Sequence, residues 1–83
     1  MKIEVLGPGC EKCGKLYAAV QQAMRYVGIE AELCKVESMP EIMRYNVLMT
    51  PALVIDGKVK VAGRVPDQAE LTSMLTTAAL EQS

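Results

Sequence analysis

Residues 52–61 read Ala-Leu-Val-Ile-Asp-Gly-Lys-Val-Lys-Val, two β-forming runs that are joined by Asp56-Gly57. An Asp-Gly pair between two such runs predicts a two-residue hairpin turn, because that turn needs positive φ at both central residues. Lysine alternates with valine in the second run, so one face of that strand is expected to face water. Its lysines would also protect an edge strand from mispairing. The stretch therefore predicts two antiparallel strands joined by a tight turn.

The residues before the hairpin predict two more strands and a long helix. Residues 2–6 are rich in β-branched residues and stop at Gly7-Pro8-Gly9, and residues 29–36 have the composition of a second strand. Between these strands, apolar residues recur at helical spacing up to Gly28, which predicts a helix of about four turns. The members of this apolar stripe are Cys13, Leu16, Tyr17, Val20, Met24 and Val27.

Two capping boxes predict the remaining helices. Ser38 with Glu41 would begin a short helix that carries Ile42 and Met43, and Asp67 with Glu70 would begin the last one. The apolar stripe of the last helix is Leu71, Met74, Leu75 and Ala78, and residues 79–83 are expected to fray.

The resulting order, β-α-β-α-β-β-α, predicts one α/β domain over residues 1–83. Strands joined through a helix should be parallel, so the strands at 2–6 and 29–36 are expected to pair in parallel. A mixed four-stranded sheet with helices on both faces is the compact arrangement of these elements. The first strand, which has neither glycine nor proline, is the candidate for a central position.

Composition excludes several classes of function. The 83 residues carry a net charge of −1, with no Trp, no Phe and three Tyr, so nucleic-acid binding is not expected. There is no His, which excludes His-dependent catalysis and His-containing zinc sites. No apolar run reaches the roughly 18 residues of a membrane span, and the first residues lack a signal-peptide pattern, so we expect a cytoplasmic protein with no membrane partner.

The chemistry of this sequence centres on Cys10-Glu11-Lys12-Cys13, where the first strand turns into the first helix. The unpaired N–H groups and the dipole at a helix start stabilise an anion, so the pKa of the Cys10 thiol should be lowered. Cys13 lies on the apolar stripe and should be sheltered. We therefore expect Cys10 to attack a substrate disulfide as the nucleophile and Cys13 to resolve the mixed disulfide.

Other uses of the cysteines remain open at this point. Two thiolates suit Cu(I), and Cys34 could add a third ligand, so a carrier or sensor of soft metals or metalloids is the first alternative. Small copper-carrying domains, however, have the order β-α-β-β-α-β. A redox-regulated interaction module without turnover is the second alternative, and simple core filling by both cysteines is the third.

Several motifs together resemble a known family. Gly7-Pro8-Gly9-Cys10-Glu11-Lys12-Cys13, then Met49-Thr50-Pro51, Asp56-Gly57 and Gly63-Arg64-Val65 resemble the small thioredoxin-like, glutaredoxin-sized redox disulfide proteins over about residues 2–80. The resemblance implies a monomeric dithiol–disulfide oxidoreductase or electron carrier without a cofactor. Its partners would be protein disulfides and a thioredoxin-reductase-like or other disulfide reductase.

The resemblance also assigns roles to residues. It implies that Cys10 is nucleophilic, that Cys13 resolves and that Pro51 is a cis-proline facing the two cysteines. A cis bond would leave the backbone of Thr50 available for pairing with an extended substrate. Glu4 stands where thioredoxins hold a buried acid that exchanges a proton with the resolving cysteine. An unpartnered buried glutamate is rare, so the alternative, a strand residue facing solvent, is favoured.

The remaining candidates have simpler interpretations. Cys34 is expected near the carboxyl end of its strand, as a regulatory thiol, a third metal ligand or, preferably, a small buried apolar residue. Met39, Met43 and Met49 could form an adaptable surface near the site, although core filling is the simpler interpretation. The lysines, Lys35 among them, are interpreted as a solvated surface.

Overall fold

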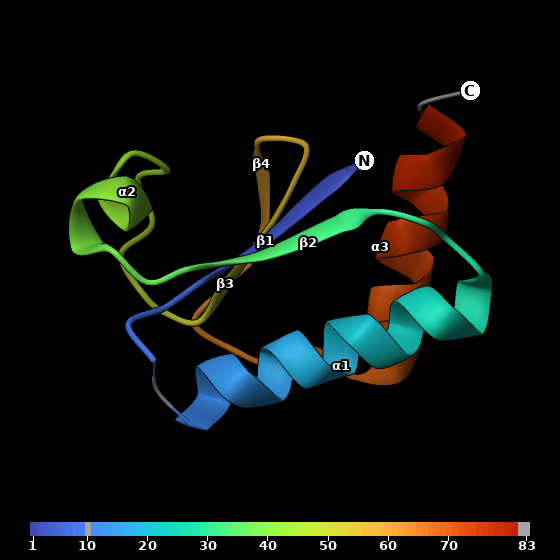
Figure 1. Ribbon diagram of the computed structural model, residues 1–83, viewed down its shortest axis with the longest axis horizontal. Helices are drawn as coiled ribbons and strands as arrows, with labels where there is room; N and C mark the ends of the chain where they lie inside the picture. Colours follow the sequence, from blue (N-terminus) through green and yellow to red (C-terminus); the bar gives the residue numbers. More distant parts are fainter. Residues whose placement is uncertain (10, 82–83) are drawn as a thin grey trace.

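The computed structural model describes residues 1–9 and 11–81. Within them the elements follow the predicted order β-α-β-α-β-β-α (Figure 1). They are β1 (Lys2–Leu6), α1 (Glu11–Val27), β2 (Glu32–Val36), α2 (Met39–Met43), β3 (Ala52–Ile55), β4 (Lys58–Ala62) and α3 (Gln68–Glu81).

The four strands form one mixed sheet in the order β2-β1-β3-β4. β1 pairs in parallel with β2 and antiparallel with β3, so it is central, as predicted. Leu6 is opposite both Val36 and Ala52, and Ala52 is opposite Ala62. This register places the carboxyl ends of β1, β2 and β4 and the start of β3 at one end of the sheet.

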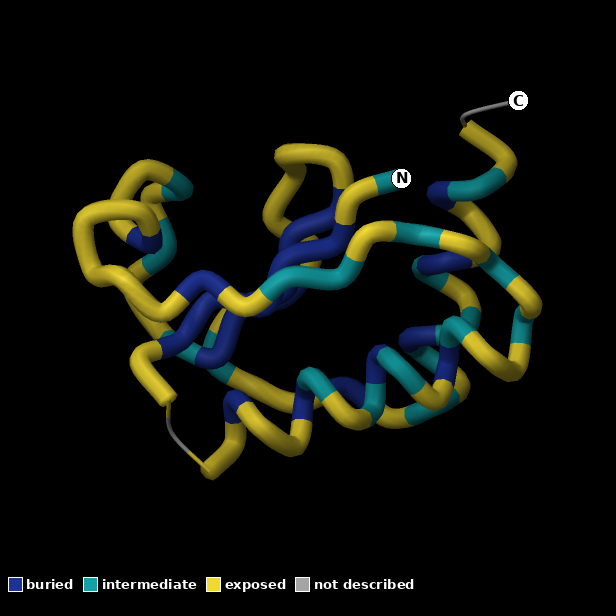
Figure 2. The backbone as a smooth tube through the Cα atoms, viewed as in Figure 1, coloured by how far each residue is buried: buried dark blue, intermediate teal, exposed yellow. Residues whose placement is uncertain are grey.

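Helices cover both faces of the sheet, because alternate residues of the inner strands are apolar on both sides. Ile3 and Val5 of β1 pack with α1 and α3, while Leu6 packs with Ile42 of α2 on the opposite face. In Figure 2 the buried backbone is concentrated in the strands and along the inner sides of α1 and α3, while α2 is mostly exposed. The sheet thus lies between two apolar clusters, of which the one under α1 and α3 is the larger.

Two predicted boundaries are wrong by a few residues. β2 begins at Glu32 rather than at residue 29, because the Ile29 N–H donates to the Met24 carbonyl and closes the end of α1. The helix α3 continues to Glu81 instead of fraying from residue 79, because Ala78 packs into the larger core cluster and holds the last turns in place. Residues 82–83 of the predicted frayed tail lie outside the described residues.

The two predicted capping boxes are incomplete. Ser38 occupies the N-cap of α2, but its side chain makes no capping hydrogen bond, and Pro40 in the first turn lacks the N–H that such a bond could use. At α3 the Asp67 carboxylate accepts from the Glu70 N–H at 2.8 Å, as predicted. The Glu70 carboxylate, however, pairs with Arg64 and not with the N-cap backbone.

The hairpin turn has the predicted geometry, with φ of 49° at Asp56 and 82° at Gly57. The alternation in β4 is less regular than predicted. A bulge at Leu53/Val54 shifts the register, and Val59 is exposed together with the lysines on either side of it.

Gly57→Ala should lower the free energy of unfolding by about 1–2 kcal/mol, because a Cβ atom is disfavoured at this positive φ. Gly57→Asn is the matched control, since asparagine tolerates the left-handed region better, and it should cost clearly less. Urea denaturation of both variants measures the difference. Equal losses would mean that the backbone angle of the turn does not limit stability.

Candidate functional site

Four segments meet at the end of the sheet that the strand register defines. They are the turn after β1, the residue after β2, the segment before β3 and the loop after β4, which comprise residues 7–9, 37, 49–51 and 63–65. Cys13, in the first turn of α1, faces the same end, since it lines a cavity together with Gly7 and Glu37. The sequence motifs that were singled out separately therefore belong to one place in the fold.

Cys13 is buried against the backbone of Gly7. Cys13 is 7% exposed. A Cβ atom built on Gly7 would lie only 2.1 Å from the Cys13 Sγ atom. The same point is 4.0 Å from the Cβ atom of Thr50. Only a residue without a side chain at position 7 allows the sulfur, the end of β1 and Thr50 to come this close. Cys13 is disulfide-bonded in this structure.

The segment before β3 has the geometry that the resemblance implied. The Thr50–Pro51 peptide bond is cis, and Pro51 is fully buried. The Gly63 N–H donates to the Pro51 carbonyl at 2.8 Å, and Met49 packs against Gly63. The roles predicted for Cys10 lie outside the described residues.

A small cavity of about 120 Å³ opens beside Cys13. Its walls are Val5, Gly7, Gly9, Cys13, Gly14, Lys35 and Glu37. The Glu37 carboxylate reaches to 3.4 Å from the position of a Cβ atom on Gly9, and the Lys35 ammonium lies 4.7 Å from the centroid of the Tyr17 ring. These two charged residues are thus part of the site.

The sequence predicted neither residue at the site: Lys35 was interpreted as part of a solvated surface, and Glu37 was given no role. A signal was present in the alternation of the strand. Leu33 packs on the α1 side of the sheet, so Lys35 and Glu37, two and four residues further on, follow it to that side.

Glu4 does not join Cys13. It lies on the opposite face of the sheet, where its carboxylate accepts a hydrogen bond from the Tyr45 hydroxyl at 2.8 Å. This hydrogen bond, followed by burial, raises the pKa of Tyr45. The favoured prediction of a solvent-facing Glu4 is wrong, since the residue is only 8% exposed. Burial is possible because Tyr45, after α2, supplies the partner that the sequence did not reveal.

Cys34 is also separate from Cys13. It stands in the middle of β2, opposite Glu4, and therefore on the α2 face of the sheet. It is half-buried rather than a core residue, and its free thiol donates to the Glu32 carboxylate. Desolvation, followed by the charge of Glu32, raises the pKa of the Cys34 thiol. The structure therefore does not bring Cys34 to Cys13 as a third ligand.

Of the methionines, Met39, Met43 and Met49 are exposed, so the simpler interpretation of core filling is wrong for all three. Met49 alone is placed at the site by a contact, the one with Gly63.

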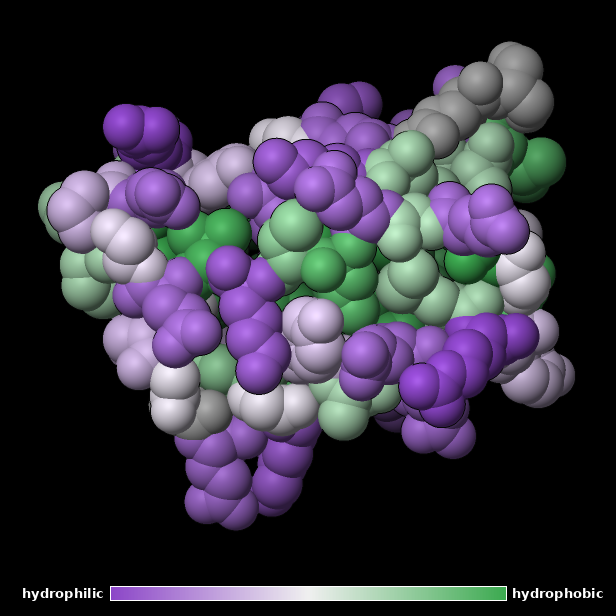
Figure 3. Space-filling view, in the orientation of Figure 1, coloured by the Kyte–Doolittle hydropathy of each residue, from purple (hydrophilic) through white to green (hydrophobic). Residues whose placement is uncertain are grey.

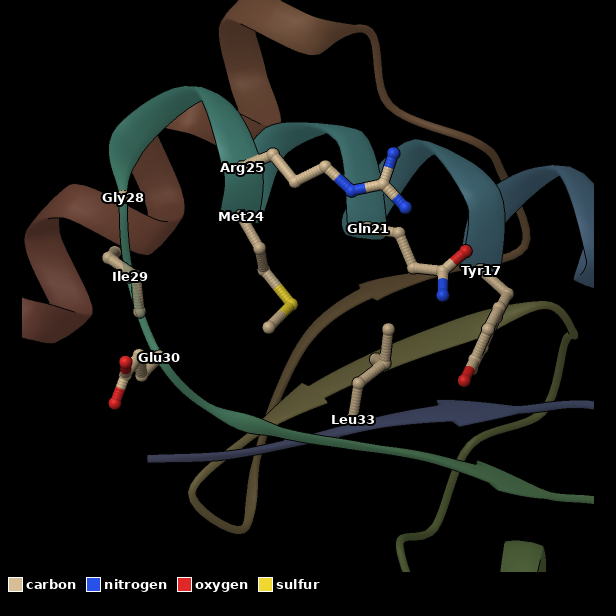
Figure 4. Close-up of a pocket in the computed structure, with 8 residues that line it drawn as sticks. All are labelled: Tyr17, Gln21, Met24, Arg25, Gly28, Ile29, Glu30 and Leu33. Atoms are coloured by element: carbon tan, nitrogen blue, oxygen red, sulfur yellow. The ribbon is translucent and has the colours of Figure 1, made fainter.

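A larger cavity of about 400 Å³ lies away from these residues, between the second half of α1 and β2 (Figure 4). Met24 and Leu33 point toward one another across it, and Arg25 lies along the helix at its rim. Figure 3 shows hydrophobic surface in the middle of this side of the molecule, between hydrophilic residues. No cysteine is among its lining residues, which are Tyr17, Gln21, Met24, Arg25, Gly28, Ile29, Glu30 and Leu33.

Two further features are absent from the described part of the chain, residues 1–9 and 11–81. These residues contain no group of three or more Cys, Asp or Glu residues placed to hold a metal ion. None of their helices has the length and apolar character needed to cross a membrane.

Comparison with known proteins agrees with this geometry. Residues 1–76 match the family described as thioredoxin domain. A protein named thioredoxin from Methanothermobacter thermautotrophicus is 34% identical over 76 residues, which are 92% of this chain and 99% of that protein. A second protein named thioredoxin, from Methanocaldococcus jannaschii, is 34% identical over 73 residues, 88% of this chain and 84% of that protein.

Gly7→Ala should lower the free energy of unfolding by about 1–3 kcal/mol, the usual cost of overpacking, because its Cβ atom would overlap the Cys13 sulfur. Gly14→Ala is the matched control: it lies in α1 with no atom within 4 Å of a new Cβ, and alanine favours the helix, so it should not destabilise. Urea denaturation measures both. An unchanged Gly7→Ala protein would contradict the close approach of Cys13 to β1.

Proposed function

The chain belongs to the thioredoxin family and is a thiol–disulfide oxidoreductase, and from this premise we propose that Cys10 and Cys13 form its redox pair. Cys10, at the start of α1, attacks one sulfur of a substrate disulfide. Cys13 then attacks Cys10 in the mixed disulfide and releases the substrate as a thiol. The protein leaves this cycle with a Cys10–Cys13 disulfide, which a disulfide reductase of the cell must reduce again.

The observation that carries this proposal is the position of Cys13. Its sulfur is buried against Gly7, whose other near neighbour is Thr50, so the sulfur is sheltered from outside reagents yet belongs to the same region as the start of β3. The chain has three cysteines, of which Cys34 is a free thiol with a raised pKa and Cys13 is disulfide-bonded. This division fits a resolving role for Cys13 and no role in exchange for Cys34.

We further propose that the substrates are disulfides in extended protein segments. Thr50 stands just before β3, and its backbone can pair with an added strand. Directly before Thr50, Leu48 is 98% exposed and Met49 is 62% exposed. Val65 is exposed in the adjoining loop, which Gly63 joins to Pro51. These side chains offer apolar contacts to the residues that flank a substrate cysteine. A reducing compartment, the cytoplasm, suits such a cycle.

Cys13→Ser should trap a mixed disulfide between Cys10 and a protein substrate, because the resolving thiol is gone and the intermediate has no intramolecular exit. Cys10→Ser should trap none, and Cys34→Ser should behave as the wild type. An assay that follows the reduction of an intact insulin-type disulfide measures turnover, and non-reducing electrophoresis with mass spectrometry counts the trapped adducts.

The outcomes separate the alternatives. Equal trapping by Cys10→Ser and Cys13→Ser would contradict the division of roles. Retention of a soft metal by the wild type through purification, with both thiols blocked and no turnover, would favour the metal-carrier reading instead.

A further inference from the structure

The resolving step needs a proton acceptor that Glu4 does not provide. A thiol attacks only as the thiolate, and an ordinary cysteine keeps its proton until about pH 8.5. Cys13 is buried, which opposes ionisation. Glu4, the acid that the family resemblance suggested, lies on the other face of the sheet and is hydrogen-bonded to Tyr45.

Glu37 is the carboxylate on the Cys13 side of the sheet. It follows the last residue of β2 and lines the same cavity of about 120 Å³ as the Cys13 side chain. Three of the seven described lining residues are glycines, and both Gly7, beside the sulfur, and Gly9, which Glu37 approaches, belong to the wall. A cavity of this volume has room for several water molecules, which the Glu37 carboxylate and the Lys35 ammonium can hydrogen-bond. A proton can therefore pass from the thiol to the carboxylate through water.

We propose that Glu37 accepts the proton of Cys13 during the resolving step, an inference that rests on the redox pair proposed above. The Cys13 S–H bond breaks, and its proton moves through water to the Glu37 carboxylate. The thiolate then bonds to the Cys10 sulfur, the bond between Cys10 and the substrate sulfur breaks, and the substrate leaves as a thiolate. Glu37 returns its proton to solvent or to that leaving thiolate. The two protein sulfurs are oxidised and the substrate disulfide is reduced.

Other charged residues near Cys13 can also affect the ionisation of its thiol. Lys35 lines the same cavity and favours the thiolate electrostatically. In α1, Lys12 is exposed, and Glu11 and Lys15 form an exposed ion pair whose charges offset each other. β1 contributes only Val5 to the cavity, and the turn after it contributes Gly7 and Gly9. Met49, Thr50 and Pro51 are not titratable. Glu37 is therefore the one carboxylate among the described residues that line the cavity.

Removing the charge of Glu37 should change the rate of the resolving step in opposite directions, depending on whether Glu37 accepts the proton or is only a nearby negative charge. If Glu37 is the proton acceptor, Glu37→Gln slows resolution. If Glu37 is only a nearby negative charge, its removal favours the thiolate, lowers the pKa of Cys13 and speeds resolution. The direction of the change therefore distinguishes the two.

The test uses the reduced protein in a Cys34→Ser background and one equivalent of an aromatic disulfide that releases a coloured thiolate. Attack by Cys10 releases the first coloured thiolate, and resolution by Cys13 releases the second, so stopped-flow absorbance separates the two steps. For Glu37→Gln we expect the first phase to be unchanged and the second to be about tenfold slower near pH 7, below the usual range for acid–base catalysis because water relays the proton. The difference should shrink as the pH rises, because hydroxide then takes the proton of the thiol without the help of Glu37.

Glu30→Gln removes the same charge from an exposed residue that lines only the larger cavity, and it should leave both phases unchanged. Glu37→Asp keeps a carboxylate and should recover part of the rate. A second phase that is unchanged or faster in Glu37→Gln, or one slowed instead by Glu4→Gln, would overturn the assignment of Glu37. Absence of the second phase in the wild type would instead overturn the Cys10–Cys13 pair.

Discussion

The close approach of Cys13 to Gly7 is the constraint on which the site depends. The sulfur occupies the space where any other residue at position 7 would place its Cβ atom, 2.1 Å away. This contact brings the first turn of α1 onto the end of the central strand. It also places Thr50 near α1, because the same point lies 4.0 Å from the Thr50 Cβ atom. Cys13, one member of the proposed redox pair, thereby lies near the segment on which a substrate could pair.

The other segments are held around this contact by polar bonds. The Gly63 N–H fixes the Pro51 carbonyl, and Arg64 pairs with Glu70, so the loop after β4 is tied both to the start of β3 and to α3. On the opposite face, Tyr45 and Glu4 tie the residues after α2 to β1. Glu4 is buried, and its carboxylate would be costly there without the Tyr45 hydroxyl as a partner. The sheet is therefore tied to its neighbouring segments on both faces.

Sequence patterns predicted most of the fold because they report local physics. The Asp56-Gly57 turn, the stripe of α1 and the central place of β1 follow from periodicity, turn chemistry and chain connection. The site was predicted less completely, because its missing parts depend on contacts between distant residues. The burial of Glu4 required Tyr45, 41 residues away. The place of Glu37 beside Cys13 required knowing which face of β2 meets α1, and the position of Cys34 on the α2 face followed from the same register.

The central claim is that one pair of sulfurs, Cys10 and Cys13, carries the redox chemistry while Cys34 stands apart. Equilibration of the protein against a series of thiol–disulfide buffers tests it most directly, followed by denaturing alkylation and mass mapping of each cysteine. The account predicts that Cys10 and Cys13 gain and lose the alkyl label together as one two-electron couple, and that Cys34 is labelled at every potential. A couple that includes Cys34, or Cys10 and Cys13 that respond independently, would contradict it.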